Sequence, residues 1–137
     1  MAHFLPHNYQ QYSIDRILDT PAIGLFLDMG LGKTVQVIAL LRVTWEANRT
    51  SLIIAPTSLT YNWLSEIHRF APELSAAVVS GTAPQRANLL RHVMNHGDVD
   101  VLITSYPLIR RAIEQIGSFR FRFVILDEAQ NIKNAGS

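Results

Sequence analysis

Seven consecutive residues near the start of the chain combine two glycines with a lysine and a hydroxyl: Asp28-Met29-Gly30-Leu31-Gly32-Lys33-Thr34. Glycines let a main-chain turn approach a ligand closely, and the first N–H groups of a following helix favour an anion. The lysine would reach the β and γ phosphates of a nucleotide, and the threonine hydroxyl would ligate Mg²⁺. The common pattern, G-x-x-x-x-G-K-[ST], begins with glycine, whereas this chain has Leu27 there. The stretch predicts a phosphate-binding turn; the alternative is a glycine-rich connection with a surface lysine.

Two adjacent carboxylates, Asp127 and Glu128, follow the apolar run Phe123-Val124-Ile125-Leu126. Ligands bind open α/β sheets beyond the carboxyl ends of the strands, so a strand here would deliver both side chains to a ligand site. Asp127 would hold Mg²⁺, directly or through water, and Glu128 would orient and deprotonate the attacking water. An ordinary strand end before a charged loop is the alternative. Together with Lys33, the pair favours hydrolysis of a nucleotide phosphate.

Short apolar runs alternate with longer amphipathic ones, and this order must position both motifs. Five runs predict buried strands: Ala22–Leu27, Ser51–Ala55, Ala76–Ser80, Val99–Thr104 and Arg122–Leu126. Five segments predict helices: Asn8–Asp19, Lys33 to about Ala47, about Ser58–Phe70, Thr82 to Gly97, and near Ser105 to Gly117. The Lys33–Ala47 segment is apolar almost all round, so we expect it to be deeply packed. The alternation predicts an α/β fold with a parallel sheet and helices on both faces.

Two further patterns could suggest chemistry but have simpler interpretations. His92 and His96 have the i, i+4 spacing of metal ligands, yet no carboxylate of the H-E-x-x-H kind accompanies them. A solvated or helix-capping pair is favoured. The alternating residues of Phe119–Phe123 could stack on bases, but strand alternation feeding the core is favoured.

The composition excludes several classes of protein. Nearly half of the residues are apolar and 17% are charged, which is typical of a folded core rather than a disordered chain. The net charge of +1 does not suggest a basic nucleic-acid arm, although ten of the twelve basic residues are Arg, which suits phosphate contacts. There is no cysteine, signal peptide or apolar run of membrane-spanning length. We expect a cytoplasmic domain without a membrane partner.

An ordered set of motifs runs from about residue 5 to the end of the chain. It comprises "DMGLGKT", "LIIAPTSLTYNWLSEIHRFAP", "VVSG" with Arg86 downstream, "VLITSYPLIRR" and "DEAQNIKN". The set resembles the Swi/Snf family of superfamily 2 helicase-like ATPases, and "DEAQ" followed by "IKN" resembles its prokaryotic branch. Members of that family carry two RecA-like lobes, bind ATP and duplex DNA across the cleft between them, and translocate along DNA. Members of that family also lack the first glycine of the phosphate-binding turn. Leu27 at that position therefore agrees with the resemblance.

The resemblance implies a fold and several residue roles. The fold would be a three-layer P-loop sheet of the RecA-like kind, with ATP and Mg²⁺ at Lys33, Thr34, Asp127 and Glu128. Gln10 would contact the adenine, although Gln11 leaves the register open by one and an exposed helix start is the alternative. Gln130 would couple the nucleotide state to the other lobe. The resemblance implies two segments that contact the DNA backbone: Pro56, Thr57, Ser58, Asn62 and Trp63 in one, and Thr104, Ser105 and Tyr106 in the other. Two alternatives stand beside these roles: Trp63 is expected in the core, and Ser105 could instead cap a helix.

The chain ends soon after Asp127, whereas family members continue into a further strand and a second lobe that supplies an arginine finger. We therefore expect residues 1–137 to form a partial N-terminal RecA-like lobe that is incomplete at its C-terminal end. In that family the missing strand lies between the strands that carry the two motifs, so its absence predicts a gap in the sheet. We expect this chain by itself to hydrolyse ATP only at background rate. In a longer protein it would serve a DNA-dependent ATPase acting at the nucleoid; a non-catalytic binding module and an inactive fragment are the alternatives.

Overall fold

The computed structural model describes residues 22–25, 31–116 and 119–127, with main chain only for residues 22–25, 31–33 and 113–116. Several expectations lie outside the described residues, among them the Asn8–Asp19 helix and the roles of Gln10, Gly30, Glu128 and Gln130. The side chains of Leu31 and Lys33 lie outside them as well. The structure does describe the strands and helices that flank these residues.

Within the described residues, five parallel strands form one sheet in the order β1-β5-β2-β4-β3. The strands are β1 Ala22–Leu25, β2 Ser51–Ala55, β3 Ala76–Val78, β4 Val101–Ser105 and β5 Val124–Asp127. The helices are α2 Leu31–Val43, α3 Thr60–Phe70 with the short 3₁₀ turn η1 Thr57–Leu59 before it, α4 Ala83–His96 and α5 Tyr106–Ile116. Every predicted strand is present, and Ser51–Ala55 has the predicted bounds.

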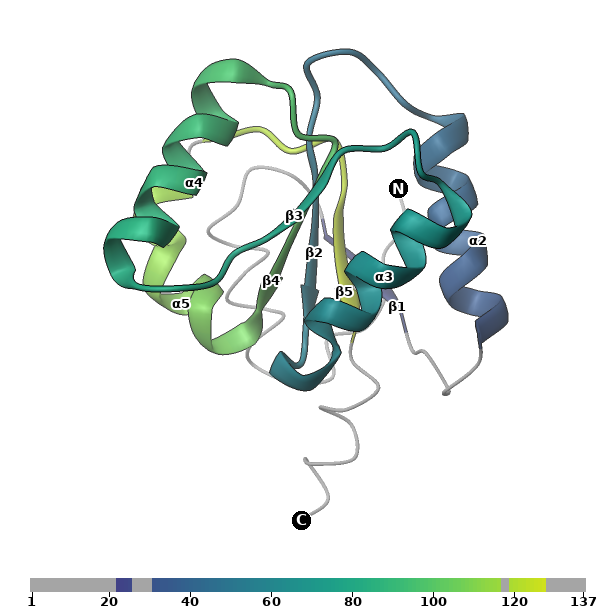
Figure 1. The fold of residues 1–137 in the computed structure, drawn as a ribbon, viewed down its shortest axis with the longest axis horizontal. Helices are drawn as coiled ribbons and strands as arrows, with labels where there is room; N and C mark the ends of the chain where they lie inside the picture. The colour runs from purple at the N-terminus through teal and green to yellow at the C-terminus, as the bar shows by residue number, and fades with distance from the viewer. Residues whose placement is uncertain (1–21, 26–30, 117–118, 128–137) are drawn as a thin grey trace.

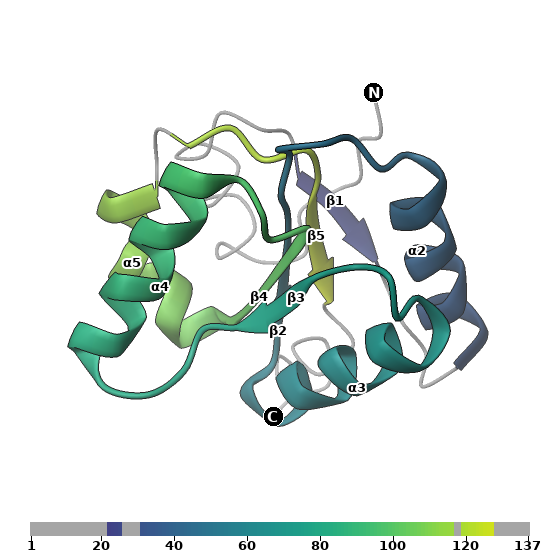
Figure 2. The same cartoon turned by 45° about the horizontal axis from the view of Figure 1, so that its top comes forward.

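Helices cover both faces of the sheet, as the alternation of patterns predicted. Helices α2 and α3 lie on one side and α4 and α5 on the other (Figure 1, and from a second angle Figure 2). Strand residues alternate between two buried clusters: Leu52 and Ile54 pack toward α4 and α5, and Ile53 packs toward α2 and α3. Burial on both faces explains why the strand sequences are continuously apolar.

The gap expected in the sheet is absent among the described strands. β1 pairs directly with β5, in a register that runs from Ala22 opposite Val124 to Leu25 opposite Asp127. The expectation of a gap is wrong for this structure. Main-chain N–H and C=O groups of a buried strand need partners, and here the two strands supply them to each other.

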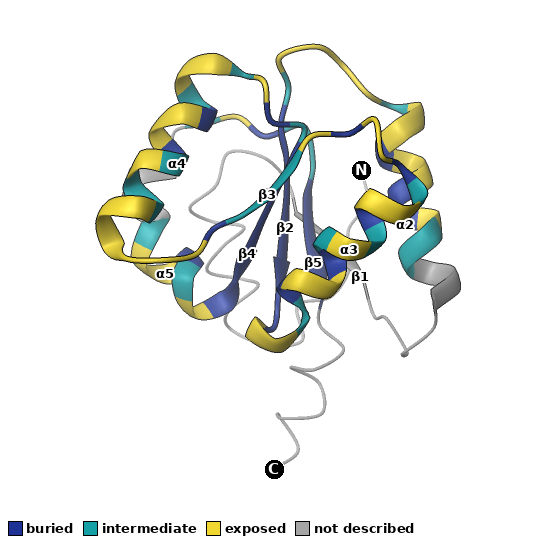
Figure 3. Cartoon of the chain, in the orientation of Figure 1, coloured by how far each residue is buried: buried dark blue, intermediate teal, exposed yellow. Residues whose placement is uncertain are grey.

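Helix α2 is buried on one face only, which corrects the expectation of deep packing all round. Val37, Ile38 and Leu41 face the sheet, whereas Leu40 is exposed and Val43 is 84% exposed. In Figure 3 the outward side of α2 is largely coloured as exposed. An apolar sequence alone could not show this, because apolar residues on the outer face give no signal of their direction.

The predicted ends of helix α4 are confirmed. The Thr82 hydroxyl accepts a hydrogen bond from the Gln85 N–H at 3.3 Å, and the Gln85 amide oxygen accepts one from the Thr82 N–H at 2.8 Å. At the other end, Gly97 adopts the left-handed conformation, with φ of 68°. His96 and His92 share this last turn: the His96 ring contacts the His92 carbonyl oxygen at 3.1 Å, as expected for a capping pair.

The aromatic residues before β5 belong to the core. Phe121 is buried, and Phe119 lies against it edge to face with ring centroids 4.8 Å apart. Phe123 packs against the cluster on the opposite face of the sheet. The favoured interpretation of this stretch as core, rather than as a base-stacking surface, is confirmed.

Candidate functional site

The parallel register brings the chemistry-bearing segments to one edge of the sheet. Asp127 ends β5 and pairs with Leu25, the last residue of β1, while Ala55 at the end of β2 pairs with Ser105 at the end of β4. β1, β2, β4 and β5 therefore end at the same carboxyl edge of the sheet, where the η1 segment follows β2 and α5 follows β4. This is the edge where open α/β sheets bind ligands.

Asp127 is buried at this edge, with 2% of its surface exposed. Its Oδ2 accepts a hydrogen bond from the Trp63 indole Nε1 at 3.0 Å, and its main-chain oxygen accepts one from the Tyr106 hydroxyl at 3.1 Å. An ionised carboxylate offers about four acceptor positions, and the Trp63 indole occupies one of them. β5 thus ends on Asp127, the first of the two carboxylates predicted at this strand end, while Glu128 lies outside the described residues.

Helix α2 begins at Leu31, six residues after Leu25, the described end of β1. Main-chain N–H groups at the start of a helix carry a partial positive charge and point along its axis. Thr34 is half-buried. It lies on the same helical face as Ile38 and Leu41, both buried against the sheet, because residues four and seven apart share a face. The phase of the helix thus places the Thr34 side chain on the sheet side of α2 rather than on its outer face.

These groups suit a nucleotide bound with Mg²⁺. Carboxylate and hydroxyl oxygens are the ligands that Mg²⁺ prefers, and Asp127 and Thr34 would provide one of each. Among the described residues, no group of three or more His, Asp or Glu side chains could hold a metal ion by itself. In nucleotide sites Mg²⁺ is usually held by one or two protein groups together with phosphate oxygens, which is the number that Asp127 and Thr34 would supply.

The segment after β2 presents polar groups to solvent. Pro56 is buried, whereas Thr57, Ser58 and Asn62 are exposed. The turn is fixed by hydrogen bonds from the Leu59 N–H to the Pro56 oxygen at 2.9 Å and from the Thr60 hydroxyl to the Thr57 oxygen at 3.1 Å. The exposed hydroxyl and amide groups are thereby held in place and remain available to a partner.

The segment after β4 differs, because Thr104 and Ser105 are both buried. The Ser105 hydroxyl accepts a hydrogen bond from the Leu108 N–H at 3.3 Å, which is the geometry of an N-cap at the start of α5. The capping role that the sequence left open for Ser105 is confirmed. Neither side chain is accessible to a partner in this arrangement.

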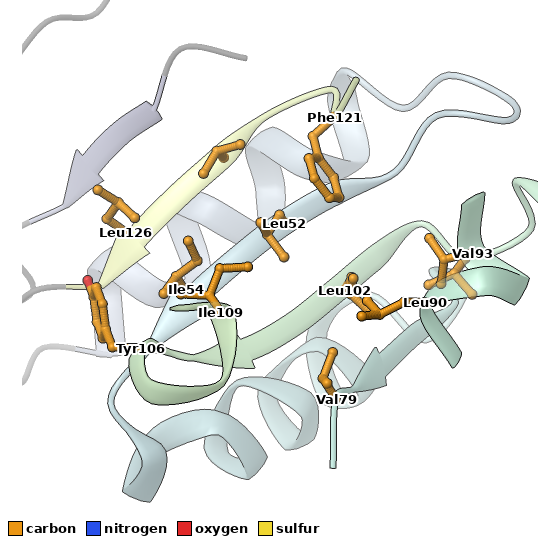
Figure 4. Packing of buried hydrophobic residues seen from close by; sticks show 12 residues of the cluster. Leu52, Ile54, Val79, Leu90, Val93, Leu102, Tyr106, Ile109, Phe121 and Leu126 are labelled. Atoms are coloured by element: carbon orange, nitrogen blue, oxygen red, sulfur yellow. The ribbon is translucent and has the colours of Figure 1, made fainter. Parts of the chain in front are cut away.

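Two aromatic residues contact Asp127, which the sequence did not predict. One of them, Tyr106, was implied to contact the DNA backbone and is instead buried. Trp63 was expected in the core and is buried, with 3% of its surface exposed, but it also donates to the Asp127 carboxylate. Tyr106, which opens α5, lies beside the carboxyl end of β5 near Leu126 (Figure 4). The position of Trp63 on the apolar stripe of α3 could not show where its single polar atom would point.

The sequence matches the family model described as the SNF2-related domain over residues 11–137. The chain belongs to the SNF2-related domain family. Among curated relatives, it is 41% identical over 134 residues to YwqA of Bacillus subtilis, whose name marks it as a candidate ATP-dependent helicase/translocase. It is 38% identical over 118 residues to the ISWI chromatin-remodeling complex ATPase ISW1 of Saccharomyces cerevisiae.

A solved structure, the Sulfolobus solfataricus SWI2/SNF2 ATPase core in complex with dsDNA, superposes with a TM-score of 0.62 at 30% identity. The match covers 94% of this chain and 25% of that one. The SNF2-related chain likewise spans 14% of YwqA and 10% of ISW1, whereas 93% and 83% of the chain itself are covered. The predicted RecA-like α/β fold is confirmed by this likeness. No helix among the described residues is long and apolar enough to cross a membrane.

Proposed function

We propose that the chain is the ATP-binding, N-terminal RecA-like part of a DNA-dependent ATPase that moves on duplex DNA. The observation that carries the proposal is the register of β1 and β5, which sets the end of β1 opposite Asp127. Because α2 is the next described element after β1, this register supports a site in which the N-terminus of α2 and the buried Asp127 carboxylate would face the same ligand. The functions named for the relatives and the duplex DNA in the Sulfolobus structure support the same proposal.

The proposed roles follow the chemistry of each group. The N–H groups around Gly30, Leu31 and Gly32 would surround the phosphates, and Lys33 would neutralise them. Thr34 and Asp127 would ligate Mg²⁺, which would offset negative charge on the phosphates, and Glu128 would deprotonate the attacking water. Gln10 would recognise the adenine, and Gln130 would relay the nucleotide state to a second lobe. Such a protein would act in the cytoplasm, at the nucleoid.

The proposed contact with duplex DNA rests on Thr57, Ser58 and Asn62. These side chains are exposed and lie on the same edge as Asp127, and hydroxyl and amide groups are common donors to phosphate oxygens. Pro56 would set the direction of the segment. Thr104 and Ser105 are buried, so the exposed residues after β2 carry this part of the proposal.

The test measures Mg-ATP affinity and ATP hydrolysis separately, in the full-length protein. Glu128→Gln should retain Mg-ATP affinity and lose DNA-stimulated phosphate release, because the amide keeps the shape of the side chain but cannot accept the proton from water. Lys33→Ala should lose both, because the charge that holds the phosphates is removed. Persistent turnover in Glu128→Gln would show that Glu128 is not the base. Unchanged ATP affinity in Lys33→Ala would reject the nucleotide site itself.

A further inference from the structure

We propose that Trp63 is a positioning residue that links the DNA-facing segment of the domain to the carboxylate proposed to ligate Mg²⁺. This inference rests on the proposed function. The connection is one hydrogen bond, from the Trp63 Nε1 to the Asp127 Oδ2 at 3.0 Å, with both residues buried. Trp63 does not touch the nucleotide in this proposal; it sets the direction of the Asp127 carboxylate.

Trp63 lies next to the residues that are proposed to contact DNA. Asn62, exposed and proposed to contact DNA, is its immediate neighbour, and Thr57 and Ser58 precede it in η1. The hydrogen bonds of Leu59 and Thr60 join η1 to the start of α3, so this short segment is continuous. A displacement of the exposed residues by bound DNA would therefore be passed to the indole less than two helical turns away.

The other side of Asp127 is held separately. Tyr106, from the opposite face of the sheet, donates its hydroxyl to the Asp127 main-chain oxygen at 3.1 Å. Trp63 belongs to the cluster beneath α2 and α3, and Tyr106 to the cluster beneath α4 and α5. With the main chain anchored from one face, movement of Trp63 on the other face would change chiefly the direction of the side chain.

A hydrogen bond to a buried carboxylate has large consequences for a metal ligand. Residues that orient metal-binding side chains typically change metal affinity 10–100-fold when they are removed. If DNA and Mg-ATP both favour the arrangement in which Trp63 holds Asp127, each ligand must raise the affinity for the other by the same factor. The coupling between DNA affinity and Mg-ATP affinity should therefore depend on the Trp63 indole N–H group.

The chain contains a second indole–carboxylate hydrogen bond, an exposed one, that serves as a control for this buried one. Trp45, its other tryptophan, donates its Nε1 to the Asp100 Oδ1 at 2.8 Å. Asp100 immediately precedes β4, so this pair lies at the amino edge of the sheet, opposite the proposed site. Trp45→Phe and Trp63→Phe each remove one indole–carboxylate hydrogen bond and retain an aromatic ring.

The first measurement is the affinity for a fluorescent ATP analogue during a magnesium titration, with and without a duplex DNA. Trp63→Phe should weaken the Mg²⁺-dependent affinity about tenfold and leave the metal-free affinity unchanged. It should also bring the ratio of affinities with and without DNA close to one. Trp45→Phe should match the unsubstituted chain in both respects. Equal magnesium dependence in the two variants would overturn the inference, and absence of Mg-ATP binding by the unsubstituted chain would overturn the proposed function together with it.

The second measurement needs no substitution at Trp63, so it holds even where Trp63→Phe fails to fold. A ¹⁵N–¹H spectrum contains one indole signal from each tryptophan, and Trp45→Phe assigns them by removing one. Addition of Mg-ATP, and then of duplex DNA, should shift the Trp63 indole signal and leave that of Trp45 in place. A Trp63 signal that stays unchanged while Mg-ATP and DNA bind would contradict the link and leave the proposed function standing.

Discussion

The orientation of α2 decides whether Thr34 faces the proposed site, and it can be tested by two truncations on the same helix. Ile38 is 1% exposed and points to the sheet, whereas Val43 is 84% exposed. Ile38→Ala should lower the free energy of unfolding by about 2–5 kcal/mol, because it removes buried methyl groups and leaves a cavity. Val43→Ala should change it by less than about 0.5 kcal/mol, because almost no buried surface is lost and alanine favours the helix.

Urea denaturation of the 137-residue chain, followed by circular dichroism, measures both changes. Where Ile38→Ala leaves too little folded protein, Ile38→Val should still cost about 0.5–1.5 kcal/mol. The reasoning would be refuted by comparable losses for the two positions, or by a loss above about 1 kcal/mol for Val43→Ala. Either result would mean that the outer face of α2 is buried or that the helix is rotated, and the direction assigned to Thr34 would then be wrong.

Three further outcomes follow from contacts elsewhere in the domain. Gly97→Ala should destabilise the chain by about 1–3 kcal/mol in thermal or urea unfolding, because its φ is positive and a Cβ there would lie 3.2 Å from the Asn48 Cα. Thr50→Val should cost about 1 kcal/mol by the same assay, since a buried hydroxyl that donates to the Val99 oxygen at 2.6 Å is lost; no measurable change would contradict this. Asn62→Ala should weaken duplex DNA binding in a fluorescence anisotropy titration and leave Mg-ATP affinity unaltered, and an equal loss of both would argue that Asn62 acts on the fold instead.

The strands of the sheet could be predicted well because burial on both faces requires a continuous run of apolar residues in the sequence. Each strand is a short apolar run between polar turns, and Ser51–Ala55 has the bounds that its run predicts, with Pro56 directly after it. The ends of helix α4 could be predicted equally well. Thr82 and Gln85 cap its N-terminus, and Gly97 ends it in the left-handed conformation. These features depend on neighbours in the sequence, so a single sequence suffices to predict them.

What the sequence did not predict depends on residues far apart. The pairing of β1 with β5 links strands a hundred residues apart, and nothing local indicates which main-chain groups will meet. The hydrogen bond from Trp63 to Asp127 spans 64 residues and uses one atom of a side chain that is otherwise apolar. The exposure of Val43 depends on where α2 lies against the sheet. In each case the partner, rather than the residue type, decides the outcome.

The most direct test of the proposed nucleotide site is thermal unfolding of the 137-residue chain with and without Mg-ATP. We predict a cooperative transition whose midpoint rises with ligand concentration, with a stabilisation of about 2.7 kcal/mol at one hundred times the dissociation constant. The rise should be lost in Lys33→Ala and reduced in Thr34→Ala, which removes the hydroxyl. An unchanged midpoint in the unsubstituted chain, or an equal rise in Lys33→Ala, would contradict the proposal that this edge of the sheet binds ATP.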